Sequence, residues 1–211
     1  MGTYLNPGNS GFAGIRNDKY VDKSGMISII NNSINTPRKL TCVSRPRRFG
    51  KSFAAKMLCA YYDRTCDSSG LFEDLAIAAD PSYRDHLNQY DVIYLDMTNI
   101  LGKTKPEKAI SFIIERVTSE LAACCSDLSS GNAFDEVLIR SVEETGHKFV
   151  IIIDEWDAPI RETPQIQKEY IEFLRMLFKG SGTTDRIIAA AYMTGILPIK
   201  KDGSLQYRMK R

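Results

Sequence analysis

Four short apolar segments, spaced along the chain, set the strongest limit on its fold. They cover residues 39–44, 91–97, 148–153 and 186–193 and are rich in β-branched side chains. Their hydrophobicity is continuous rather than alternating, which is typical of strands buried on both faces of a sheet. Because stretches with helical periodicity lie between them, we expect an α/β fold: a three-layer sandwich with a mainly parallel sheet and right-handed crossovers.

Segments with helical patterns lie before and between these strands: residues 20–34, 52–62, 104–123, 133–145 and 164–179. Thr104 and Glu107 have the spacing of a capping box, which predicts the start of the third helix at Thr104. Gly146 and Gly180 follow the last two segments and predict helix ends, since glycine adopts the left-handed conformation at little cost. The first segment predicts a turn leading into a helix that packs beside the loop after the first strand.

That loop, RPRRFGKS (Arg45–Ser52), ends in Gly-Lys-Ser, as many phosphate-binding loops do. The usual loop has a glycine at the position of Arg45, and arginine resists the positive φ that glycine adopts. Pro46 restricts Arg45 to extended geometry, so we expect the chain to leave the strand extended and to curl over residues 47–51. A Gly-Lys-Ser triplet alone is a weak signal, and a basic strand–turn–helix without a ligand remains the alternative.

A phosphate-binding loop presents successive backbone N–H groups at the N-terminus of a helix. The predicted contacts come from Arg47, Arg48, Phe49, Gly50, Lys51 and Ser52. We expect Lys51 to reach the β- and γ-phosphates as a catalytic residue, and the Ser52 hydroxyl to ligate Mg²⁺.

An acidic pair, Asp154 and Glu155, directly follows the third apolar segment. Phosphoryl transfer needs one carboxylate that holds Mg²⁺ and another group that orients or deprotonates the attacking water. Asp154 is the predicted metal residue and Glu155 the predicted catalytic base; a pair that merely faces solvent is the alternative. Thr194, at the end of the fourth strand, is the predicted γ-phosphate sensor. A threonine that only serves the turn after the strand is an equally good interpretation. Asp96 ends the second strand and is interpreted as a turn residue or a support for this site.

The composition excludes several other classes of site. A net charge of +2 with 26% charged residues favours neither a disordered acidic chain nor a nucleic-acid-binding surface. His86 and His147 are the only histidines and lie far apart in the sequence, so neither a zinc site nor a Ser-His-Asp set is expected. The five cysteines show no C-x-x-C spacing, which predicts reduced thiols and a cytoplasmic protein. No segment approaches the roughly 20 apolar residues of a membrane span, so no membrane partner is expected.

Six stretches carry a resemblance to a known family: YVDKSGMI, SRPRRFGKS, YYDRTCDSSGLFEDL, VIYLDMT, IIIDEWDAPI and YMTGILPIK. They follow one another across about residues 12–201 and are together similar to the AAA-ATPase-like family of bacterial and some eukaryotic proteins. In that family a P-loop domain precedes a PD-(D/E)XK nuclease-like domain. The family itself carries RPRRFGKS, so the resemblance implies that Arg45 is its ordinary residue; Trp156 stands where the family has tyrosine.

The resemblance implies an ASCE/AAA-like P-loop NTPase with ATP and Mg²⁺ as ligands. Lys51 and Ser52 carry over as phosphate and Mg²⁺ residues, Asp154 as the second Mg²⁺ residue, Glu155 as the base and Thr194 as the sensor. Arg47 and Arg48 would add phosphate contacts, with one of them expected to be a solvated surface charge.

We expect a cap or helix segment over residues 1–36 and a P-loop core over residues 37–211. Similar proteins continue past YMTGILPIK, so we expect a core truncated at its C-terminus, without the lid and the nuclease-like domain. Three functions remain open: an ATPase that forms ADP and phosphate, a switch that binds ATP and hydrolyses little, and a fragment that binds nothing strongly. A homo-oligomer or a partner protein is left open, and nucleic acid enters only through the family context.

Overall fold

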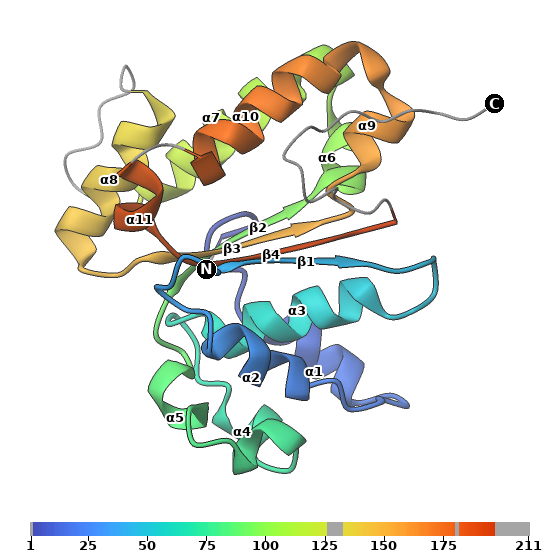
Figure 1. Ribbon diagram of the computed structural model, residues 1–211, viewed down its shortest axis with the longest axis vertical. Coiled ribbons are helices and arrows are strands. Elements are labelled where there is room, and N and C mark those ends of the chain that lie inside the picture. Colours follow the sequence, from blue (N-terminus) through green and yellow to red (C-terminus); the bar gives the residue numbers. More distant parts are fainter. Residues whose placement is uncertain (1, 126–132, 180–181, 197–211) are drawn as a thin grey trace.

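A computed structural model describes residues 2–125, 133–179 and 182–196, which form a four-stranded sheet between two helical layers (Figure 1). The strands are β1 (Leu40–Ser44), β2 (Asp91–Asp96), β3 (Phe149–Asp154) and β4 (Ile188–Gly195). All neighbours pair in parallel, in the order β1-β4-β3-β2. Each strand overlaps one of the four apolar segments, so the predicted α/β class with a parallel sheet is confirmed.

The register of the sheet brings the ends of all four strands to one edge. Asp96 pairs with Asp154, Asp154 with Thr194, and Thr194 with Val43. Because the strands are parallel, the connections that leave their carboxyl ends meet at this edge, the usual position of ligand sites in open α/β sheets. The order also places β4 between the strand of the basic loop and the strand of the acidic pair.

One face of the sheet is covered by the later helices of the chain (Figure 1). These are α6 (Met97–Lys103), α7 (Ala109–Ala122), α8 (Phe134–Thr145), α9 (Ala158–Glu162), α10 (Gln167–Lys179) and α11 (Thr183–Ile187), with the 3₁₀ turns η2 (Pro106–Lys108) and η3 (Pro164–Ile166). Gly146 ends α8 with φ 73°, as predicted. The predicted stop at Gly180 lies outside the described residues.

The predicted capping box at Thr104 is wrong. Helix α6, which the sequence did not suggest, ends there, and Thr104 is its extended C-terminal residue, with φ −143° and ψ 166°. The next element begins with Pro106 in η2, and α7 follows after Lys108, which makes no side-chain cap hydrogen bond. Proline suits the first position of a helix because its missing N–H would have no partner there, so the chain starts without the threonine.

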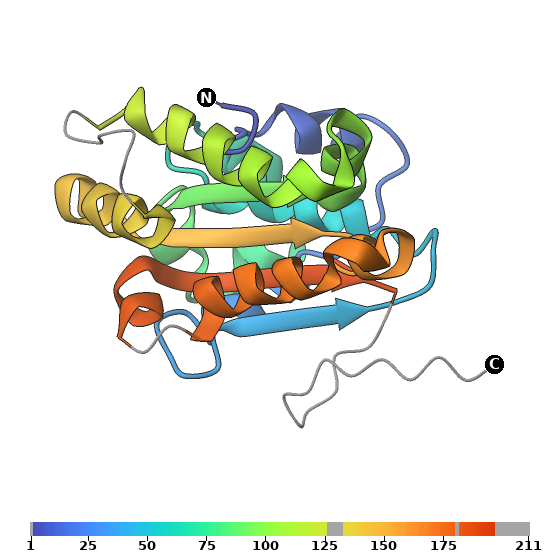
Figure 2. The same cartoon turned by 90° about the horizontal axis from the view of Figure 1, so that it is seen from above.

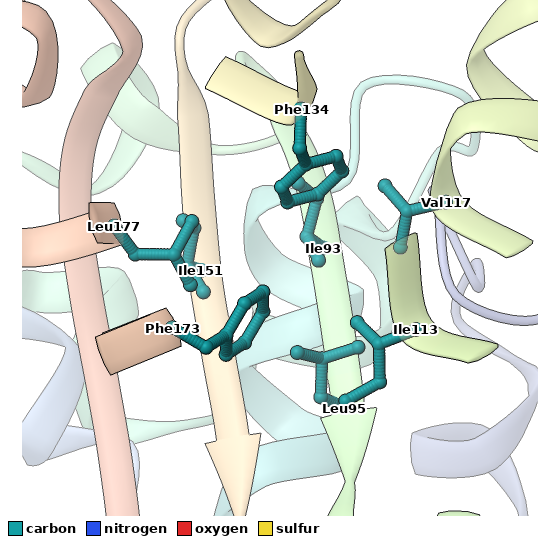
Figure 3. A pocket seen from close by; sticks show the side chains of 8 residues that line it. All are labelled: Ile93, Leu95, Ile113, Val117, Phe134, Ile151, Phe173 and Leu177. Atoms are coloured by element: carbon teal, nitrogen blue, oxygen red, sulfur yellow. The ribbon is translucent and has the colours of Figure 1, made fainter. Parts of the chain in front are cut away.

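The core on this side contains the apolar faces of α7 and α10, which lie within the helical patterns of residues 104–123 and 164–179. A small cavity of about 10 Å³ lies within it, between β2, β3 and helices α7, α8 and α10 (Figure 3). Its lining is entirely apolar: Ile93, Leu95, Ile113, Val117, Phe134, Ile151, Phe173 and Leu177. Such a void offers no hydrogen-bond partner to water, and it includes none of the predicted site residues.

The opposite face is covered by the early helices: α1 (Ser10–Arg16), α2 (Gly25–Asn31), α3 (Lys51–Tyr62), α4 (Ser69–Phe72) and α5 (Tyr83–His86), with the 3₁₀ turn η1 (Ala76–Ala79). Helix α3 packs directly on the sheet, and most of its residues are buried. Stacked and edge-on aromatic rings of Phe12, Phe72 and Tyr61 join α1, α4 and α3 into one core. Residues 2–36, here called the N-terminal segment, thus pack beside α3, the helix that follows the basic loop.

Residues 2–6, here called the N-terminal stretch, run along the outer edge of β2. Tyr94 N–H donates to the Tyr4 carbonyl at 2.8 Å, and Asn6 N–H donates to the Val92 carbonyl at 2.7 Å. The Glu120 carboxylate of α7 accepts the N–H groups of residues 3, 4 and 5 at 2.7–3.0 Å. At the other edge, none of the described helices lies over β1 on the face that α10 covers on its neighbours (Figure 2). Helices in the described ranges are all too short or too polar to cross a bilayer.

Candidate functional site

The basic loop joins the carboxyl end of β1 to the N-terminus of α3. Arg45 N–H donates to the Gly195 carbonyl at 3.1 Å, which extends the pairing with β4 by one residue. Positive φ values occur at Arg48 (70°) and Gly50 (71°), and not at Arg45. The chain therefore leaves the strand extended and curls afterwards, as predicted, but the sequence did not identify Arg48 as the residue under strain. A non-glycine residue in this conformation is disfavoured by about 1–2 kcal/mol, which is typical of loops constrained for function.

Lys51 is the first residue of α3 and is buried, with 7% of its surface exposed. Its Nζ donates to the Pro46 carbonyl at 3.1 Å and lies 3.6 Å from Glu155 Oε1. The lysine thus bends back over the loop and toward the acidic pair. The side chains of Arg47, Arg48 and Phe49 are exposed, so any contact from Phe49 to an anion would come from its backbone.

Asp154 ends β3 with 1% of its surface exposed. Burial raises the pKa of its carboxyl, the Ser52 hydroxyl opposes this through a hydrogen bond, and the nearby Asp96 and Glu155 carboxylates raise it further. The predicted metal residues Ser52 and Asp154 therefore lie close to each other. Asp96 itself caps α6 by accepting Asn99 N–H at 2.9 Å, which accounts for it as a turn residue.

Hydroxyl and carboxylate oxygens are hard donors that fit Mg²⁺, an ion usually bound by one or two protein carboxylates together with phosphate oxygens and water. The described residues contain no cluster of three or more histidine, cysteine or acidic side chains that could hold a metal alone. The pair Ser52 and Asp154 suits an ion that arrives with a phosphorylated ligand. A buried carboxyl with a raised pKa also gains from a cation, because the cation compensates its lost hydration.

Glu155 lies in the turn after β3 with φ 51°, a conformation that few glutamates adopt. One carboxylate oxygen faces Lys51, and the other accepts from Arg161 of α9 at 3.2 Å. Arg161 Nε also donates to Asp157 Oδ2 at 3.0 Å, and Asp157 is completely buried. The same Oδ2 accepts Ile196 N–H at 3.2 Å, so these charges connect the loop, β3, α9 and the end of β4.

Sequence reasoning missed Arg161 and Asp157. Their i, i+4 spacing directly after the acidic pair was the available signal, because such a pair shares one face of a helix.

Thr194 lies opposite Asp154 in the register of the sheet and is completely buried. Its Oγ1 makes no hydrogen bond of normal geometry among the described residues, although the Tyr192 hydroxyl lies near it. Since buried hydroxyls nearly always have well-formed hydrogen bonds, such a hydroxyl at a strand end can indicate an unfilled site. The structure thus brings Lys51, Ser52, Asp154, Glu155 and Thr194 to one edge of the sheet.

A family model described as "Predicted AAA-ATPase" matches residues 7–205 of the chain. The chain is also similar to the "Uncharacterized protein in vnfD 5'region" of Azotobacter chroococcum mcd 1, with 25% identity over 188 residues. That alignment covers 86% of this chain and 34% of the relative, so the chain spans about a third of the length of that protein. No solved structure matches the chain.

Proposed function

The chain belongs to the AAA-ATPase-like family of predicted AAA-ATPases, and on this premise we propose that it binds ATP with Mg²⁺ and hydrolyses it to ADP and phosphate. The observation that carries the proposal is the convergence of a loop lysine and a buried acidic pair at one sheet edge. Lys51 Nζ lies 3.6 Å from Glu155 Oε1, and Ser52 lies close to Asp154.

The strand order supports an ASCE-type site. Strand β4 lies between the loop strand β1 and the acidic strand β3. Thr194 therefore lies between Val43 and Asp154 in the register, and its hydroxyl would contact the terminal phosphate from there. Thr194 Oγ1 makes no hydrogen bond of normal geometry among the described residues, which suits it to this role as the γ-phosphate sensor.

The loop would bind the phosphate chain through its backbone N–H groups at the N-terminus of α3, where the helix dipole favours an anion. Lys51 would leave Glu155 and the Pro46 carbonyl for the β- and γ-phosphates. Arg47 and Arg48 are exposed beside this position and add positive charge. Mg²⁺, held by Ser52 and Asp154, would neutralise charge that develops on the phosphate oxygens.

Glu155 would act as the general base on the attacking water. Once Lys51 turns to the phosphates, Glu155 Oε1 is released, while Arg161 retains Oε2 at 3.2 Å. A carboxylate held on one oxygen keeps its direction and has the other oxygen free to accept a proton.

A second function, an ATP-dependent switch with little hydrolysis, is favoured by one specific observation. Both oxygens of Glu155 face cations, Lys51 and Arg161. A carboxylate with both oxygens paired has neither oxygen free to accept a proton from water. Glu155 would then respond to ATP mainly by exchanging partners.

The test is a single-turnover assay with excess protein, labelled ATP and Mg²⁺, which follows bound nucleotide and released phosphate together. Lys51→Ala should abolish binding, whereas Lys56→Ala, an exposed lysine on the same helix, should not. Glu155→Gln should keep ATP bound and lower phosphate release by at least about a hundredfold. ATP that stays intact on the unaltered protein would establish the switch instead, and binding that survives Lys51→Ala would refute both functions.

A further inference from the structure

The segment before α2 contributes a lysine to the basic loop that the proposed function does not use. Lys23 Nζ donates to the Phe49 carbonyl at 2.6 Å, between residues 26 positions apart in the sequence. A Cβ atom at Gly50 would lie only 2.5 Å from Lys23 Nζ, so a side chain at residue 50 would displace the ammonium from this position. The Lys23 side chain makes no other hydrogen bond or ion pair in the part of the chain that the structure describes.

The residues on either side of Lys23 fix its backbone on η1. Asp22 Oδ1 accepts Ser24 N–H at 2.7 Å, and Asp22 Oδ2 accepts Ala76 N–H at 2.8 Å. Ser24 is completely buried, and its Oγ accepts Ile77 N–H at 3.1 Å. These bonds anchor the chain on both sides of the lysine, so its side chain extends to the loop from a fixed position.

The bond from Lys23 also sets the direction of the next N–H group. The described residues contain no cis peptide, so the C=O of Phe49 and the N–H of Gly50 belong to one planar trans unit and point in opposite directions. Lys23 holds the carbonyl toward the N-terminal segment, and the Gly50 N–H therefore points away from that segment. Among the described residues this N–H has no hydrogen-bond acceptor, which leaves it available to a ligand.

We propose that Lys23 is a positioning residue of the phosphate loop: it holds the Phe49–Gly50 peptide so that the Gly50 N–H is aimed at the phosphate chain of the bound nucleotide. The ammonium group also polarises the peptide and strengthens its N–H as a donor. The left-handed φ of Gly50, 71°, belongs to the same arrangement. This inference rests on the proposed ATP site but not on hydrolysis.

An ordinary solvated lysine is the competing interpretation, since Lys23 is exposed. It would explain neither the short bond to a backbone carbonyl nor the anchoring of both neighbours. Direct binding of phosphate by Lys23 is a different role, and it would require the ammonium to leave the carbonyl side of the peptide.

The experiment measures the dissociation constants of MgATP and of inorganic triphosphate by calorimetry, at low salt and at about 0.5 M salt. The variants are Lys23→Ala, Lys23→Arg and, as a matched control, Lys19→Ala. Lys19 is exposed in the same segment and has no hydrogen bond or ion pair among the described residues. Lys51→Ala reports separately on the proposed function.

Lys23→Ala should weaken both ligands about tenfold, which corresponds to about 1.4 kcal/mol. The loss should persist at high salt, where a long-range charge effect is screened, and Lys23→Arg should restore most of the affinity. The inference is overturned if Lys23→Ala binds both ligands as tightly as the unaltered protein does, or if Lys19→Ala weakens binding as much as Lys23→Ala. It is also overturned if high salt removes the difference in affinity between Lys23→Ala and the unaltered protein. Affinity that is insensitive to Lys51→Ala would instead overturn the proposed function.

Discussion

Arg161 is expected to be the most important single cation for the stability of the acidic edge. Its guanidinium joins three carboxylates: Asp157 at 3.0 Å, Glu155 at 3.2 Å and Glu162 at 3.4 Å. Their side chains differ in exposure, with 0% for Asp157, 21% for Glu155 and 45% for Glu162. The pair with Asp157 therefore decides what Arg161→Ala does.

The magnitude follows from leaving Asp157 buried without its cation. Removing one partner of a buried ion pair costs about 3–5 kcal/mol. Ile196 N–H still donates to Asp157, and Arg161 is itself 20% exposed, so water can enter the vacated space and the lower end of this range applies. The two more exposed pairs add at most about 1 kcal/mol each. We expect the free energy of unfolding to fall by about 3 kcal/mol.

Urea denaturation followed by circular dichroism measures this change. With an m-value of about 2–3 kcal/mol/M, the midpoint should fall by about 1–1.5 M. Glu162→Ala, which loses only the exposed pair, should shift the free energy by less than about 1 kcal/mol. Arg161→Lys should recover only part of the loss, because an ammonium cannot reproduce the forked contact with two carboxylates.

A double-mutant cycle provides the refutation. In an Asp157→Asn background only the two more exposed pairs of Arg161 remain, so Arg161→Ala should then cost about 2 kcal/mol at most. An equal cost in both backgrounds would show that the two side chains are not coupled, and the account of this network would be wrong.

Two further outcomes are expected. Gly195→Ala should lower the free energy of unfolding by about 1–3 kcal/mol in a thermal melt, because its Cβ would lie 2.8 Å from the buried Trp156 ring; an unchanged melting temperature would contradict this packing. Burial opposes ionisation of Asp22, but N–H bonds from Ala76 and Ser24 outweigh it and lower the pKa. The charged form therefore stabilises the fold above the unfolded pKa, and Asp22→Asn should destabilise the protein slightly at pH 7 and lose this effect near pH 3, as urea midpoints at both pH values would reveal.

The strands were predictable because each carries its own burial pattern. Residues 149–153, for example, are buried on both faces, and this requirement is visible in five consecutive apolar side chains. The order of the strands was not predictable from such patterns, since it depends on which helix covers which face. The predicted helix start at Thr104 was wrong for a local reason. A threonine three residues before an acidic residue is also compatible with the end of one helix, and here the next helical turn begins only at Pro106.

The candidate site was predictable only where its residues are neighbours in the sequence. Lys51 with Ser52, and Asp154 with Glu155, occur as short motifs whose chemistry is apparent without a fold. Lys23 was missed because its partner lies in a loop that only the packing of the N-terminal segment brings near. The positive φ of Glu155 was also missed, because the turn after β3 imposes it against the preference of the side chain.

The N-terminal stretch has a consequence for the synthesis of the chain. Residues 3–5 leave the ribosome before Glu120, which accepts their N–H groups and follows 115–117 residues later. At roughly 5–20 residues per second, translation separates the two by about 6 s or more. The stretch that covers the edge of β2 is thus made before β2 itself, and its contacts with Glu120 cannot form until α7 has emerged.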